Sequence, residues 1–140
     1  MTKVEFHYNV SDPMKLAAIL TAEYLGKKRR ILIFAPDPAR YEMIDRVLWT
    51  YAQLSFVPHC AADADLADET PVLLIRDDRL LPTQDVLVNL SDDAPSFFSR
   101  FLTVIDIVGC TEAEKVPGRI RYRFYQDRGY PMDRFDHEGN

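Results

Sequence analysis

The chain alternates between strand-like and helix-like segments, and this alternation limits its possible folds more than any other feature. Residues 4–8 alternate in polarity and predict a strand, and residues 31–34 form the continuous apolar run typical of a strand buried on both faces. Each strand is followed by an acidic cap and a proline, Asp12-Pro13 and Asp37-Pro38, which mark helix starts. The helices expected from apolar spacing cover residues 14–25 and 39–51. This order of elements implies parallel strands joined by crossover helices.

The rest of the chain extends the pattern less regularly. Further strands are expected at residues 56–57 (ended by Pro58), 72–75, 86–90 and 103–108. Residues 60–70 read as an exposed acidic loop, and residues 94–102 as a short helix with inward-facing Phe97, Phe98, Phe101 and Leu102. We find no repeat, low-complexity tract or linker. The predicted fold is a single α/β domain over residues 1–140, a three-layer α/β/α arrangement with a mostly parallel central sheet.

The last helix carries conflicting signals at its start. Thr111 and Glu114 match a capping box, which predicts a helix beginning there. Pro117-Gly118 then falls within the expected helix, so the helix either starts late, near Pro117, or is kinked at that point. In both cases it should continue to about residue 127 and stop at Gly129.

Composition and local sequence features indicate where in the cell the protein is expected. The 140 residues are 47% hydrophobic, enough for a core, but no apolar run approaches the roughly 20 residues that a membrane span needs. The N-terminal residues do not resemble a signal peptide. Cys60 and Cys110 predict free thiols, with one optional bridge as the minor alternative. We therefore expect a cytoplasmic protein with no membrane association.

Charge is distributed unevenly along the chain. Residues 115–134 hold six basic and two acidic residues, interleaved with aromatic side chains, whereas the whole chain has a net charge of −5. Guanidinium groups beside aromatic rings suit a partner that offers carboxylates or phosphates and a ring to bury. The alternative is a solvated helix face whose arginine stems pack over a core. A pI near 5.1 argues against tight, non-specific binding of duplex DNA by the whole surface.

The sequence offers no constellation for catalysis. Its five glycines form neither a dinucleotide-binding nor a P-loop motif. His59-Cys60 has no further cysteine or histidine at metal-ligand spacing, and no feature favours a catalytic Cys/His pair over an interior thiol and imidazole. The acidic pairs Asp77-Asp78 and Asp92-Asp93 are typical of turns. We expect no metal and no cofactor.

Trp49 and Phe56 are candidates for a second contact surface. Large aromatic residues are common anchors of protein interfaces. The alternative is that both fill the core where a helix meets the sheet.

Three stretches of the chain resemble a known family, the chi subunit of the bacterial DNA polymerase III holoenzyme. They are residues 48–49 with 55–59, residues 85–90, and an ungapped stretch from 104 to 129 that includes Lys115, Arg119, Arg121, Tyr122 and Tyr125. The resemblance covers nearly the whole chain. It diverges at residues 60–70, at the final turn and at Pro117-Gly118, where the family usually continues a regular helix.

The resemblance implies a non-catalytic adapter of the clamp-loader assembly. In the family, one surface binds the acidic C-terminal tail of single-stranded-DNA-binding protein, which ends in a Pro-Phe carboxylate, and another binds the psi subunit. Arg119 would pair with the terminal carboxylate, Val108 and Tyr122 would frame a pocket for the phenylalanine ring, and Lys115, Arg121 and Arg123 would attract the tail's aspartates.

The resemblance also assigns Trp49 and Phe56 to the psi surface, which some relatives use for an accessory helicase. Contact with nucleic acid would be mainly indirect, through the single-strand-binding protein. A nucleotide-dependent α/β enzyme, or a decayed relative of one, is the alternative function. Direct binding of single strands by the Arg/Tyr segment is a third and weaker possibility.

Overall fold

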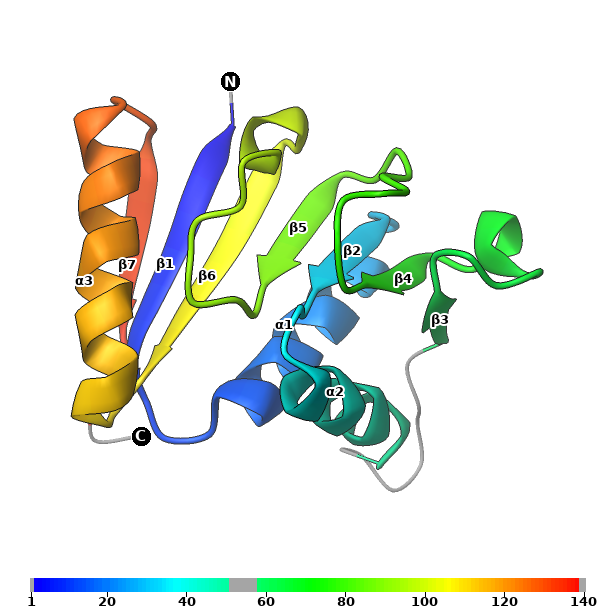
Figure 1. Cartoon of the computed structure of the whole chain (residues 1–140), viewed down its shortest axis with the longest axis horizontal. Coiled ribbons are helices and arrows are strands. Elements are labelled where there is room, and N and C mark those ends of the chain that lie inside the picture. The colour runs from blue at the N-terminus through cyan, green and yellow to red at the C-terminus, as the bar shows by residue number, and fades with distance from the viewer. Residues whose placement is uncertain (1, 51–57, 139–140) are drawn as a thin grey trace.

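The computed structural model describes residues 2–50 and 58–138, and these form one twisted sheet flanked by helices (Figure 1). In chain order the elements are β1 (Lys3–Val10), α1 (Pro13–Gly26), β2 (Ile31–Phe34), α2 (Pro38–Thr50), β3 (His59–Ala61), the 3-10 turn η1 (Ala67–Glu69), β4 (Val72–Ile75), β5 (Val86–Asn89), the 3-10 turn η2 (Phe98–Arg100), β6 (Thr103–Gly109), α3 (Glu112–Asp127) and β7 (Met132–Asp136).

Across the described residues the seven strands follow the order β3-β4-β2-β5-β6-β1-β7, and every neighbouring pair is parallel. The predicted α/β class is confirmed, and the sheet is fully rather than mostly parallel. The N-terminal strand β1 lies between β6 and β7, so elements from both ends of the chain meet at one side of the sheet. Among the residues described, no helix combines the length and the apolar character that a membrane crossing requires.

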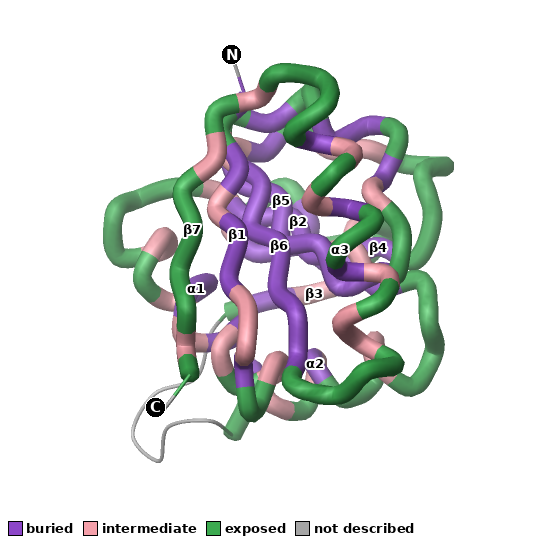
Figure 2. The backbone as a smooth tube through the Cα atoms, turned by 90° about the vertical axis from the view of Figure 1, so that its left-hand side faces the viewer, coloured by how far each residue is buried: buried purple, intermediate pink, exposed green. Residues whose placement is uncertain are grey.

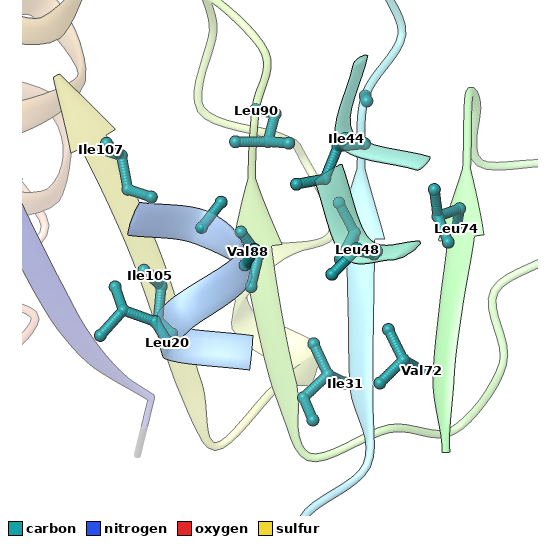
Figure 3. Packing of buried hydrophobic residues seen from close by; sticks show 14 of the residues in the cluster. Leu20, Ile31, Ile44, Leu48, Val72, Leu74, Val88, Leu90, Ile105 and Ile107 are labelled. Atoms are coloured by element: carbon teal, nitrogen blue, oxygen red, sulfur yellow. The ribbon is translucent and has the colours of Figure 1, made fainter. Parts of the chain in front are cut away.

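Both faces of the sheet are covered, which gives the predicted three layers. On one face, Leu20 of α1 and Ile44 and Leu48 of α2 pack over alternate strand residues such as Ile31 and Val88 (Figure 3). On the other face, Tyr125 of α3 and three phenylalanines from the segment before β6 pack over the remaining strand residues; these phenylalanines are Phe97, Phe98 and Phe101. Continuous apolar runs therefore correctly predicted strands that are buried on both faces.

Local signals explain the helix starts. The side chain of Asp12 accepts a hydrogen bond from the backbone N–H of Lys15, with Pro13 as the first residue of α1. Thr111 caps α3 by accepting from the backbone N–H of Glu114. The capping-box prediction is thus confirmed, and the alternative of a late start near Pro117 is wrong, because Pro117 lies inside a helix that begins at Glu112.

Several boundaries differ from the prediction. The first described strand after α2 is β3, so Cys60 and Ala61 belong to a strand rather than to the expected loop. The predicted strand at 56–57 lies outside the described residues. The helix expected over 94–102 is only the short turn η2. Leu102 is 59% exposed rather than inward-facing, because it lies between this turn and the start of β6.

Strand β7 was not predicted at all. It is the edge strand beside β1 and, unlike β1 and β6, it is exposed along most of its length (Figure 2). Its sequence, MDRFD, contains three charged residues and lacks the apolar content of a buried strand.

Candidate functional site

A groove of about 520 Å³ lies between α3 and the strands β1, β6 and β7. Its apolar side is formed by Phe6 of β1 and Val108 of β6, together with the ring of Tyr122 from α3. The rings of Phe6 and Tyr122 meet edge to face, with centroids 5.2 Å apart. Because Phe6 and Val108 are also buried, they form a fixed apolar surface at the bottom of an otherwise polar groove.

The rest of the groove is basic. Lys115, Arg119 and Arg123 line it from α3, and Arg134 lines it from β7. Among the described residues, no aspartate or glutamate lines it, although the chain as a whole carries a net charge of −5. A groove with this charge attracts anions over distances of about a Debye length, roughly 8–10 Å at ordinary salt.

The cations on α3 are largely available to a ligand. Arg119 has one carboxylate neighbour, Glu112, at 3.8 Å, and both side chains are well exposed. An ion pair of this kind contributes little because water screens it. Within residues 2–50 and 58–138, neither Lys115 nor Arg123 makes an ion pair.

Gly118 explains why the unusual Pro117-Gly118 pair is compatible with this site. A side chain added at Gly118 would place its Cβ 2.7 Å from both methyl groups of Val108, which is closer than real Cβ contacts come. The glycine therefore permits α3 to lie directly against β6 beside the groove. This close approach holds Val108 and the next turn of the helix, with Tyr122, on the same groove.

Arg121 was grouped with the tail-binding residues in the sequence, but it does not line the groove. It lies on the helix face toward the sheet, with Gly118 and Tyr125, and is 4% exposed. Its Nε donates to both carboxylate oxygens of Asp106, at 2.9 and 3.0 Å, and its Nη1 donates to the carbonyl of Asp92 at 2.9 Å. Arg121 thus joins α3 to the sheet, and we leave it out of the ligand-binding residues.

A buried polar network surrounds this ion pair. Asp106 is fully buried and accepts hydrogen bonds from the hydroxyl of Tyr125 at 2.9 Å and from Nδ2 of Asn89 at 3.3 Å, in addition to those from Arg121. Burial and the neighbouring Asp106 carboxylate raise the pKa of the Tyr125 hydroxyl, so it remains a donor. The network fixes the position and rotation of α3, and hence of the groove.

Arg134 is the site residue that sequence reasoning missed. It is paired in register with Phe6 across β1 and β7, and its Nη1 donates to the Tyr122 hydroxyl at 2.9 Å. The signal that could have suggested it was the basic excess of residues 115–134, of which Arg134 is the last member. Without strand β7, however, nothing placed it beside the helix.

Trp49, one of the two predicted psi-surface residues, lies elsewhere. Trp49 is on α2, which covers the opposite face of the sheet from α3, and it is 51% exposed. Its ring lies 5.0 Å from that of His59, whose Nε2 is 2.7 Å from an Asp45 carboxylate oxygen. Trp49 therefore does not fill the core, whereas Phe56 lies outside the described residues.

Two of the acidic residues considered for catalysis make structural contacts. Asp77 accepts from the backbone N–H of Arg79, and Asp92 pairs with Arg40 at 2.8 Å, as expected of turn residues. Cys60 and Cys110 are free thiols. In the part of the chain that the structure describes, no group of three or more histidine, cysteine, aspartate or glutamate side chains is arranged to hold a metal ion.

Comparison with known proteins identifies the family. The family described as DNA polymerase III chi subunit, HolC, matches residues 1–133. The chain is 30% identical over 136 residues to the DNA polymerase III subunit chi of Pseudomonas aeruginosa, covering 94% of each chain. It is 29% identical over 119 residues to the Haemophilus influenzae subunit, covering 84% of this chain and 83% of that one. It is 28% identical over 120 residues to the Escherichia coli subunit, covering 85% and 82%.

The match spans all the elements that build the groove except most of β7. The chain belongs to the DNA polymerase III chi subunit family.

Proposed function

We propose that this protein is a non-catalytic adapter of the replicative polymerase, which captures the acidic C-terminal tail of single-stranded-DNA-binding protein in the groove beside α3. The observation that carries the proposal is the composition of that groove. Lysine and arginine side chains surround an apolar bottom, and none of the described residues that line it carries a carboxylate. A peptide end that carries a terminal carboxylate, aspartates and a phenylalanine ring complements each of these features.

The roles of the groove residues follow from their positions. Arg119 offers a planar fork of N–H donors that a terminal carboxylate can accept in pairs. Val108 and Tyr122 contribute the apolar surface against which the terminal phenylalanine ring would pack. Lys115 and Arg123 lie on the same helix face and would attract the tail's aspartates at longer range.

The second surface, around Trp49, is proposed to bind the psi subunit and so to link the protein to the clamp loader. Its support is a large, half-exposed aromatic side chain on the far face of the sheet from the groove. The two partners could then bind at the same time. An accessory helicase is a further candidate for this second surface. Nucleic acid would be reached mainly through the single-strand-binding protein.

Calorimetric titration with a tail peptide ending in Asp-Ile-Pro-Phe tests the adapter function. Amidation of the terminal carboxylate should weaken binding by about tenfold, because it removes a charged acceptor from a groove of cations. Binding of the free-acid peptide should also weaken as salt is added. Equal affinity for the two peptides would overturn the proposed capture of a chain end. Saturable binding of ATP without binding of the peptide would favour the alternative, a nucleotide-dependent enzyme.

Trp49→Ala tests the second surface. This change should weaken psi binding by about tenfold or more, as expected for an aromatic anchor, and should leave tail-peptide binding unchanged. Surface plasmon resonance with immobilised psi measures the first effect. Met43→Ala is the matched control, since Met43 is an apolar residue of the same helix with similar exposure, 49%. If the two variants bind psi equally well, Trp49 is not an anchor.

A further inference from the structure

We propose that Arg134, on the edge strand β7, is a second carboxylate anchor of the groove, and that it binds an acidic side chain upstream of the ligand's terminal residue. This inference rests on the proposed capture of an acidic chain end, and it adds a residue and a specificity that the family match does not assign. The match ends at residue 133, immediately before Arg134.

The position of Arg134 is determined by strand pairing. In the parallel register, Phe6 of β1 is opposite Arg134 of β7, and Phe6 contacts Tyr122 of α3. Registered neighbours in a sheet project from the same face. The Arg134 side chain therefore lies on the α3 side of the sheet, and it lines the same groove as Arg119.

Arg134 is held in place but keeps donors for a ligand. Its Nη1 donates to the Tyr122 hydroxyl at 2.9 Å, which uses one of its five N–H groups. Over the described residues it makes no ion pair. The nearby Asp136 is occupied instead by the side-chain amide of Asn9, at 2.9 Å, and by the backbone N–H of Glu138. Arg134 is thus a positioned guanidinium whose charge has no partner among these residues.

Two anchors on different walls select a particular ligand chemistry. Arg119 lines the groove from the helix and Arg134 from the strand, and the Tyr122 ring belongs to the apolar surface between them. A terminal carboxylate whose two oxygens pair with the fork of Arg119 leaves Arg134 available to a second acidic group. A peptide with an aspartate a few residues before its terminal phenylalanine supplies the second carboxylate. The apolar bottom of the groove suits the ring of the peptide's terminal phenylalanine.

A double-mutant cycle between protein and peptide tests the inference. Arg134→Gln should weaken binding of the Asp-Ile-Pro-Phe peptide by about three- to fivefold, as for one partly screened charge pair. The same change should have almost no effect on a peptide in which this aspartate is replaced by asparagine. Tyr122→Phe, which removes the hydroxyl that holds Arg134, should cost less in the Arg134→Gln background than in the wild type.

Arg46→Gln is the matched control, because it removes the same charge from an exposed arginine on α2, away from the groove. If Arg134→Gln binds the aspartate peptide as well as this control does, while amidation of the peptide still weakens binding, then the second anchor is overturned and the adapter function stands. Equal losses for the aspartate and asparagine peptides would overturn the pairing with this aspartate. Loss of binding to a single-stranded oligonucleotide, with no loss of peptide binding, would assign Arg134 to nucleic acid instead and overturn the proposal.

Discussion

Arg121→Ala is expected to lower the free energy of unfolding by about 3–5 kcal/mol, the usual cost of removing one member of a buried ion pair. Asp106 is 0% exposed in the native protein, and the substitution removes its cationic partner. Tyr125 and Asn89 still donate to it, but neither neutralises its charge. Urea denaturation monitored by circular dichroism measures the loss.

Two further variants define the cause of this loss. Asp106→Asn in the Arg121→Ala background should recover part of the lost stability, because it removes the unpaired charge. Arg128→Ala is the control, because Arg128 directly follows the same helix, is exposed and lies over the Phe124 ring. It should cost less than about 1 kcal/mol. If Arg121→Ala costs no more than Arg128→Ala, the buried ion pair does not hold α3 to the sheet.

Arg119→Ala is expected to weaken binding of the tail peptide by roughly 1.5–3 kcal/mol, about 10- to 100-fold, as for the loss of a charge-assisted hydrogen bond. Stability should change little, because the only ion pair of Arg119 within the described residues is the exposed contact with Glu112. Calorimetry with the free-acid and amidated peptides separates the terminal carboxylate from the remaining charges. The amidated peptide should bind wild type and Arg119→Ala almost equally.

The same variant distinguishes the two surfaces. Binding of psi should be unchanged, because the Trp49 surface lies on the other side of the sheet. Arg128→Ala again serves as the control, because it removes a positive charge at the end of α3, outside the groove. If Arg119→Ala binds the peptide as well as Arg128→Ala does, Arg119 is not the carboxylate clamp.

The sequence was sufficient for the elements whose signals are local. Asp12 and Thr111 mark helix starts by their own hydrogen bonds, and continuous apolar runs mark buried strands such as β2 and β4. The helix over residues 94–102 failed as a prediction because its three phenylalanines are buried by a 3-10 turn and the chain around it, without any helical repeat.

The groove was predictable only in part, because it depends on contacts between distant segments. Val108, Lys115, Arg119, Tyr122 and Arg123 were grouped through the family resemblance, and the structure brings them to one groove. Arg121 was grouped with the groove residues because the sequence alone does not show which side of a helix faces the sheet. One signal was available: an aspartate at position 106, within an otherwise apolar strand, requires a buried donor.

Strand β7 escaped prediction for a different reason. An exposed edge strand needs no apolar alternation, so its five residues resemble a polar tail. Its pairing partner, β1, lies more than 120 residues earlier in the chain. Arg134 could therefore not be assigned to the groove before this pairing was known.

The position of β1 between β6 and β7 has a consequence for synthesis of the protein. Residues 3–10 leave the ribosome first, yet both of their hydrogen-bonding neighbours belong to the last 40 residues of the chain. Until those residues emerge, the apolar side chains of β1 have no sheet to join, and closing this loop carries a large entropic cost. The groove is consequently among the last features to form. A nascent chain that still lacks residues 132–136 has an incomplete groove, without the strand that carries Arg134.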